Sequence, residues 1–149
     1  MSKSLKKINN KIFLEKDLRI KLDSWRQKGE KIVFTNGCFD LIHLGHIEVL
    51  ARSADLGDRL IIGVNTDISI KNIKGENRPI VEEDSRVKQL AALEFVDAVI
   101  LFNESTPNKI INHIKPDIIT KGGDYKIKEV VGYETCLLYT SPSPRDVST

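Results

Sequence analysis

Apolar residues along the first 120 positions alternate between short continuous runs and stripes with helical spacing. The runs are rich in β-branched residues and predict four buried strands, at residues 31–35, 60–64, 96–101 and 117–120. The stripes predict amphipathic helices around residues 14–25, 47–54, 87–91 and 110–114. Because strands buried on both faces have unbroken apolar runs, this alternation predicts an α/β fold, a Rossmann-like three-layer sandwich with a parallel sheet between helices.

Local signals set the expected ends of the helices. Gly29 and Gly57 follow the first two stripes, where glycine commonly ends a helix. Thr106 and Pro107 are expected to cap and open the last helix. The stretch after the second strand is polar, includes KGENRP at residues 74–79, and is expected to be a loop.

The last fifteen positions differ from the rest of the chain. Residues 135–149 (TCLLYTSPSPRDVST) hold one short apolar patch followed by Ser-Pro-Ser-Pro, without periodicity. This composition predicts a disordered tail or a cloning artefact outside the fold. We therefore expect one domain at residues 1–134.

Composition and charge narrow the class of protein. The chain has 149 residues, of which 40% are apolar and 30% charged, and it has no apolar run long enough for a signal peptide or a membrane span. Its net charge of +2, from scattered residues, gives no reason to expect a nucleic-acid partner. Cys38 and Cys136 form neither a disulfide framework nor a metal-binding spacing. A cytoplasmic globular domain is expected.

Candidate chemistry gathers where the first buried strand runs into a helix. Right-handed crossovers place the loops at residues 35–46, 65–67 and 121–125 at one edge of the sheet, where open parallel sheets bind ligands. In the first loop, His43 and His46 flank Gly45, and on the first turn of a helix both rings can face one direction. A helix N-terminus favours anions, and imidazoles can donate hydrogen bonds to phosphate oxygens. The arrangement suits phosphoryl or nucleotidyl transfer.

Other interpretations of the histidines remain open at this point. The pair could be capped or solvated loop residues, which is the interpretation we favour for His113. Together with Asp40 it could also bind zinc, although the spacing of three is not the i, i+4 pair typical of helical zinc sites.

The whole loop, TNGCFDLIHLGH, resembles the HxGH signature of the cytidylyltransferase-like nucleotidyltransferases. GVNTD (63–67), KGENRP, ALEFVDAVILF (92–102) and KPDIITKGGDY (115–125) follow in that family's order. Within the family, residues 10–134 are most similar to bacterial D-glycero-β-D-manno-heptose 1-phosphate adenylyltransferases, which occur free-standing or as the C-terminal half of a kinase fusion. The resemblance implies AMP transfer from ATP to heptose 1-phosphate for lipopolysaccharide synthesis, with Mg²⁺, a separate sugar kinase in the pathway, and a homodimer as one possible assembly.

The resemblance also implies roles for particular residues. His43 and His46 would hold the triphosphate and stabilise the transition state, while Asp40 and Asp67 would face the acceptor. The remaining implied contacts are to the nucleotide, and come from Thr35, Asn36, Gly37, Cys38, Phe39, Gly45, Lys74, Arg86, Lys121, Gly123 and Asp124. No protein metal site is implied.

Some of these assignments have simpler alternatives. Lys74 could be a solvated loop cation, Arg86 could pair with Glu82 one turn away, and the glycines of KGGDY could serve a structural turn. Cys38 itself is expected to be a small buried residue.

The function has alternatives too. A cytidylyltransferase acting on glycerol 3-phosphate or ethanolamine phosphate would share the chemistry. A non-catalytic nucleotide-binding module is a further alternative, because residues 135–149 lack the Ser-Thr-Thr segment that the family places at a helix N-terminus.

Overall fold

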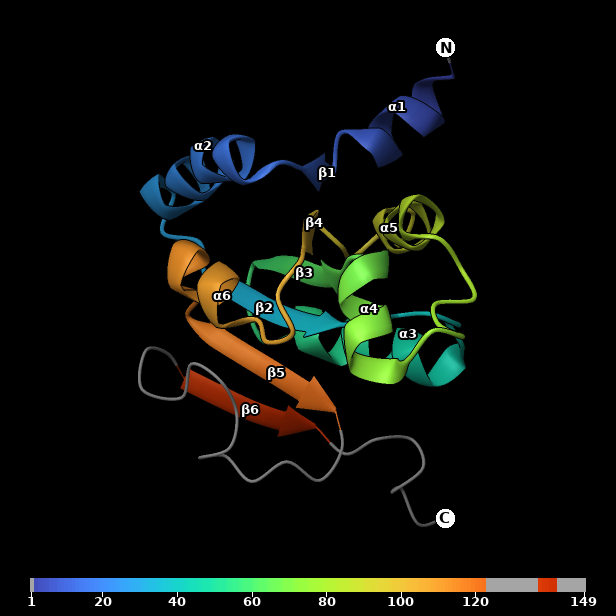
Figure 1. Ribbon diagram of the computed structural model, residues 1–149. Coiled ribbons are helices and arrows are strands. Elements are labelled where there is room, and N and C mark those ends of the chain that lie inside the picture. Colours follow the sequence, from blue (N-terminus) through green and yellow to red (C-terminus); the bar gives the residue numbers. More distant parts are fainter. Residues whose placement is uncertain (1, 123–136, 142–149) are drawn as a thin grey trace.

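The computed structural model describes residues 2–122 and 137–141, which form a sheet of six parallel strands (Figure 1). The strand order is β1-β4-β3-β2-β5-β6. The strands are β1 Ile12–Phe13, β2 Ile32–Gly37, β3 Arg59–Asn65, β4 Ala98–Phe102, β5 Ile118–Gly122 and β6 Leu137–Ser141. All five neighbouring pairs are parallel, which confirms the predicted α/β class.

Helices cover both faces of the sheet and complete the three layers. They are α1 Lys3–Asn9, α2 Glu15–Gln27, α3 Leu44–Ala54, α4 Asp67–Lys74, α5 Glu83–Ala91 and α6 Asn108–Ile114. On one face, α2 and α6 bury Leu22 and Ile111 against Phe34 of β2. On the other, α3 and α5 bury Leu50 and Leu90 with Val33 of the same strand. This alternation of neighbouring side chains between two cores is the period of a buried strand.

The helix boundaries agree with the sequence in part. Gly29 follows α2 with φ +74°, the left-handed conformation expected of a glycine after a helix. Helix α6 begins at Asn108 with Pro107 at its N-cap and no side-chain cap, so the prediction of a Thr106 cap is wrong. The expected loop after β3 is also wrong in its first half, because residues 67–74 form α4. Thr66 caps this helix by accepting a hydrogen bond from Ser69 N–H at 3.2 Å.

The C-terminal strand is the largest difference from the sequence prediction. Residues 137–141 pair with β5 in register from Ile118↔Leu137 to Gly122↔Ser141. The prediction of a disordered tail is therefore wrong for these residues, because a short run with strand-favouring residues can pair with the open edge of β5. The other residues of 135–149 lie outside the described part of the chain.

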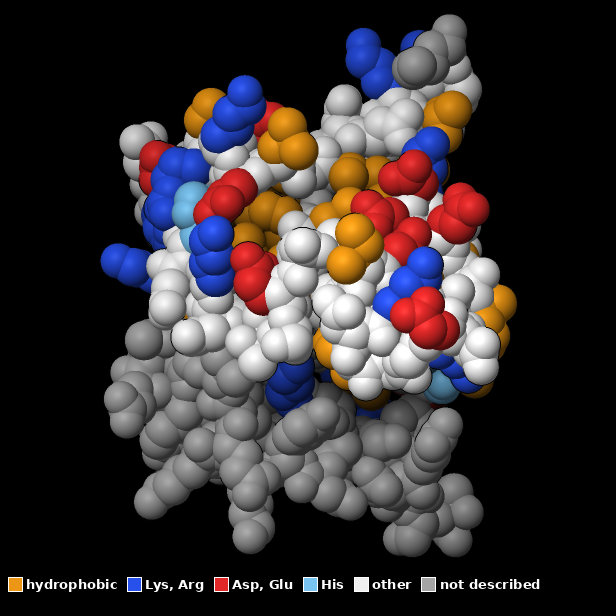
Figure 2. All heavy atoms as spheres, viewed as in Figure 1, with side chains coloured by type: hydrophobic (Ala, Val, Ile, Leu, Met, Phe, Trp, Pro, Cys, Tyr) orange, Lys and Arg blue, Asp and Glu red, His pale blue; other side chains and the backbone are white. Residues whose placement is uncertain are grey.

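The face of the molecule in Figure 2 shows no single dominant charge. On the face in Figure 2, basic and acidic side chains are both present and neither sign covers it. Among the described residues, no helix combines the length and the apolar character needed to span a membrane.

Candidate active site

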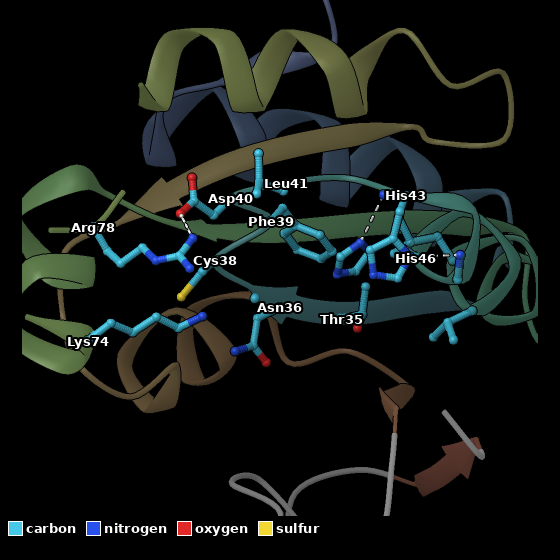
Figure 3. Close-up of a pocket in the computed structure, with 14 residues that line it drawn as sticks. Thr35, Asn36, Cys38, Phe39, Asp40, Leu41, His43, His46, Lys74 and Arg78 are labelled. Atoms are coloured by element: carbon cyan, nitrogen blue, oxygen red, sulfur yellow. Dashed lines mark hydrogen bonds and ion pairs between the residues drawn. The ribbon is translucent and has the colours of Figure 1, made fainter. Parts of the chain in front are cut away.

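A cavity of about 720 Å³ opens at the carboxyl end of β2, where the sequence places its candidate chemistry (Figure 3). Its walls come from the end of β2, the loop to α3, the first turns of α3, the end of α4 and the loop after α4. The lining residues are Thr35, Asn36, Gly37, Cys38, Phe39, Asp40, Leu41, His43, Gly45, His46, Val49, Leu50, Lys74 and Arg78. Of the thirteen predicted site residues that the structure describes, ten therefore line one cavity.

The two histidines are held by the first turn of α3. His43 is the N-cap, and its Nδ1 accepts a hydrogen bond from Gly45 N–H at 3.0 Å. The side chain of His46 points back toward His43, and His46 Nδ1 accepts a hydrogen bond from His43 N–H at 3.2 Å. The ring centroids lie 4.1 Å apart with a tilt of 43°. Both rings are thereby fixed side by side at the edge of the cavity.

These hydrogen bonds assign the tautomer of each ring. An imidazole nitrogen that accepts a backbone N–H carries no proton, so the proton of the neutral ring is on Nε2. His43 and His46 can then each donate through Nε2, which is the chemistry that phosphate oxygens need. The zinc alternative is not supported, since the described residues contain no cluster of three His, Cys, Asp or Glu side chains suited to a metal.

Phe39 packs beneath His46 in an unusual backbone conformation. Its φ is +51°, and its ring meets that of His46 edge-on at a centroid distance of 5.8 Å. Gly37 leaves room for this ring, because a Cβ at that position would lie 3.1 Å from Phe39 Cε2. Such a conformation persists only where its surroundings fix it.

Arg86 fixes the backbone on which this conformation depends. Its side chain is fully buried, and its guanidinium donates to Cys38 O and Asn65 O at 2.7 Å and to Val81 O at 2.9 Å. It also pairs with Asp67 Oδ1 at 2.6 Å. The structure thus places Arg86 and Asp67 outside the cavity lining, and the alternative of a side-chain pair between Arg86 and Glu82 is not what forms, because the guanidinium pairs with Asp67.

Asp40 lines the cavity, but its oxygens are engaged by the chain itself. Its carboxylate accepts hydrogen bonds at 2.8 Å from the N–H groups of Ile80 and Val81 and forms an ion pair at 3.0 Å with Arg78. Burial alone would raise the pKa of Asp40, but these hydrogen bonds outweigh it and lower the pKa. Asp40 therefore anchors the strap formed by residues 78–81 to the loop after β2.

Other candidate residues vary in their placement. Thr35 is buried and donates to Thr120 O at 3.1 Å, whereas Asn36 Oδ1 is a buried acceptor without a hydrogen-bond partner in the described part of the chain. Cys38, expected to be buried, is partly exposed. Lys121 does not line the cavity, and burial lowers its pKa to about 8, with the neighbouring Cys38 opposing that shift.

Four further positions complete the comparison with the sequence predictions. Gly123 and Asp124 lie outside the described residues. His113 lies in α6, is partly exposed and does not line the cavity, and its Nδ1 lies 3.0 Å from Glu15 Oε1. The cavity also has a lining residue that the sequence did not predict, Arg78; its place in the motif KGENRP, four residues after Lys74, is the signal that could have found it.

The fold and the cavity together define a nucleotidyltransferase of the Rossmann-like type. The chain belongs to the cytidylyltransferase-like family, whose model matches residues 34–140, a span that reaches into β6. It is 54% identical over 115 residues to the bifunctional protein HldE of Methylobacillus flagellatus, covering 77% of this chain and 24% of that protein. With HldE of a Nitratiruptor species it shares 49% identity over 132 residues, covering 87% and 29%. The chain thus spans about a quarter of the length of these curated relatives.

Solved structures agree with this assignment. The lipopolysaccharide core biosynthesis protein of Thermoplasma volcanium superposes with a TM-score of 0.65 at 33% identity, covering 77% of this chain and 97% of that one. Pantoate-beta-alanine ligase of Francisella tularensis superposes with a TM-score of 0.56 at 16% identity, covering 83% and 64%. At that identity the second likeness concerns the fold alone.

Proposed function

We propose that this domain transfers AMP from ATP to D-glycero-β-D-manno-heptose 1-phosphate, forming ADP-heptose and pyrophosphate for lipopolysaccharide core synthesis. The observation that carries the proposal is the pair of imidazoles at the cavity edge, whose Nδ1 atoms accept hydrogen bonds from the helix start, so that the proton of each neutral ring is on Nε2. The similarity to HldE and to a lipopolysaccharide core biosynthesis protein supports the choice of acceptor.

Catalysis of this reaction requires the protein to position anionic groups and does not require it to transfer protons. A phosphate oxygen of the acceptor attacks the α-phosphorus of ATP, the bond from that phosphorus to the oxygen bridging to the β-phosphate breaks, and pyrophosphate leaves with the electron pair. The nucleophile is already an anion, so no strong base is needed. His43 and His46 would donate to the α- and β-phosphate oxygens, where negative charge builds up in the transition state.

The remaining predicted residues enter the proposal as nucleotide contacts. Thr35, Asn36, Gly37 and Gly45 would allow close approach of the triphosphate at the end of β2, and Lys74 would reach it from α4. Mg²⁺, when bound, would neutralise triphosphate charge and be held by phosphates and water, since the described residues offer no cluster of three metal ligands. We further propose that Lys121, Gly123 and Asp124 contact the nucleotide, that the reaction takes place in the cytoplasm and that a sugar kinase supplies the acceptor.

The test is pyrophosphate release from ATP and from CTP, each with heptose 1-phosphate and Mg²⁺. We expect release with ATP, and a loss of about 10²–10³-fold in kcat for His46→Ala, the magnitude typical of removing one donor to a developing charge. His113→Ala is the matched control, because His113 is a partly exposed histidine that does not line the cavity. Preference for CTP with glycerol 3-phosphate or ethanolamine phosphate would replace the proposal by a cytidylyltransferase, and no release by folded protein would indicate a non-catalytic nucleotide-binding module.

A further inference from the structure

The cavity also has two cationic side chains, away from the two histidines. Arg78, on the strap after α4, and Lys74, the last residue of α4, both line it (Figure 3). In Figure 3 these two side chains lie on one side of Asn36 and Cys38, and the histidine rings lie on the other. The cavity therefore offers hydrogen-bond donors at two separate places.

Arg78 is aimed by a buried carboxylate. Its Nη1 lies 3.0 Å from Asp40 Oδ2, and the side chain of Asp40 is only 7% exposed whereas that of Arg78 is 42% exposed. An arginine has five N–H donors, and the described part of the chain engages one nitrogen of this guanidinium. The remaining donors keep the planar fork that fits a phosphate group.

The ion pair is not needed to satisfy Asp40. The carboxylate already accepts from Ile80 N–H at 2.8 and 3.1 Å and from Val81 N–H at 2.8 Å. A half-exposed arginine contributes little to stability through such a pair. The position of Arg78 is thus better explained by what it presents to the cavity than by what it adds to the fold.

The transfer reaction brings two phosphate-bearing molecules into one cavity. If the histidines hold the triphosphate, the acceptor phosphate needs its own cation to offset repulsion between the two anions. We infer that Arg78 binds the phosphate of the acceptor, a sugar phosphomonoester, and that Asp40 is the positioning residue that orients its guanidinium. This inference rests on the proposed function for the identity of the acceptor.

The first experiment separates the two substrates by their KM values. Arg78→Gln should raise the KM for heptose 1-phosphate by roughly 10- to 100-fold, as expected for losing a charge-assisted hydrogen bond, and change the KM for ATP by less than about threefold. Arg78→Lys should recover part of the loss, because it keeps the charge but not the fork. Lys71→Gln is the matched control, an exposed cation one turn before Lys74 that does not line the cavity.

Asp40→Asn tests the positioning role. It should raise the KM for the acceptor in the same direction as Arg78→Gln, and in the double variant the two effects should not add. A rise in the KM for ATP equal to that for the acceptor, or an unchanged KM for the acceptor in Arg78→Gln, would overturn the inference.

A binding measurement keeps this inference separate from the proposed function. Calorimetric titration of heptose 1-phosphate into the protein with a non-hydrolysable ATP analogue needs no turnover. If the wild type binds but does not turn over, the proposed transfer fails while weaker binding by Arg78→Gln still supports the inference. If the wild type does not bind the sugar phosphate, or Arg78→Gln binds it equally well, the inference is wrong.

Discussion

Replacing Arg86 with methionine should lower the free energy of unfolding of the protein even when no substrate is bound. Methionine has a similar volume, but it removes the donors that now satisfy three backbone carbonyls, those of Cys38, Asn65 and Val81. It also leaves the Asp67 carboxylate without the partner at 2.6 Å. The family resemblance implies a different role for Arg86, a contact to the nucleotide, so the same variant separates the two interpretations.

The expected magnitude follows from the burial of these groups. Removing one partner of a buried ion pair costs about 3–5 kcal/mol. Asp67 is 29% exposed, so water can solvate part of its carboxylate, but the carbonyls of Cys38, Asn65 and Val81 each lose a donor as well, at about 1–3 kcal/mol for a buried group. Since these effects do not simply add, we expect a loss of about 3–5 kcal/mol, a large part of the 5–15 kcal/mol typical of a domain.

The assay is urea unfolding of the ligand-free protein, with thermal unfolding as a second probe. A loss of this size should lower Tm by roughly 6–20 °C, at about 2–4 °C per kcal/mol for a chain of this length. Arg52→Met is the control, because Arg52 is exposed near the end of α3 and such changes usually stay within about 0.5 kcal/mol. If Arg86→Met unfolds like the wild type but raises the KM for ATP, the clamp interpretation is wrong and Arg86 acts on the phosphates.

Two further predictions concern the cavity walls. Because the folded pKa of Asp40 lies below its ordinary value of 3.8, its stabilising contribution is complete above that pH and is lost as the pH falls through the folded pKa. The difference in unfolding free energy between wild type and Asp40→Asn, from urea titrations, should therefore be constant from pH 7 to about 4.5 and shrink below it; a constant difference down to pH 3 would contradict this. Gly37→Ala should press on the Phe39 ring and lower kcat several-fold, at a cost of about 1–3 kcal/mol, whereas unchanged kcat would show that the Phe39–His46 contact does not matter for turnover.

The layers of the fold could be predicted because they depend on local patterns. The four strand runs appear as β2, β3, β4 and β5, and the loop that carries His43 and His46 lies at their carboxyl edge as expected. Helix α4 escaped prediction because its sequence, DISIKNIK, is largely polar and buries few side chains, among them Ile70. Strand β6 was not predicted because a run of five residues next to Ser-Pro repeats is too short to show a clear hydrophobic periodicity.

The roles of charged residues depended on partners far away in the chain. The carbonyls that bind Arg86 come from positions 5, 21 and 48 residues away, and Asp40 binds residues about 40 positions further on. The helical and strand periodicities of a sequence do not reveal contacts between residues so far apart in the chain. The sequence did indicate that Arg86 is buried, because it lies beside Val87 and four residues before Leu90, on the apolar stripe of its helix. A charge on that face must find buried partners.

Val81 connects these two charged anchors. Its N–H is held by Asp40 and its carbonyl by Arg86, so the strap that carries Arg78 is fixed from both sides to the loop after β2. Arg86 also holds the Cys38 carbonyl, next to Phe39, whose ring supports His46. Arg86 does not itself line the cavity, but its guanidinium thus sets the positions of both groups of hydrogen-bond donors there. A pre-organised site loses affinity when the residues that support it are lost. Weakening the hydrogen bonds of Arg86 should therefore raise the KM for both substrates, whereas loss of Arg78 should raise the KM for the acceptor alone.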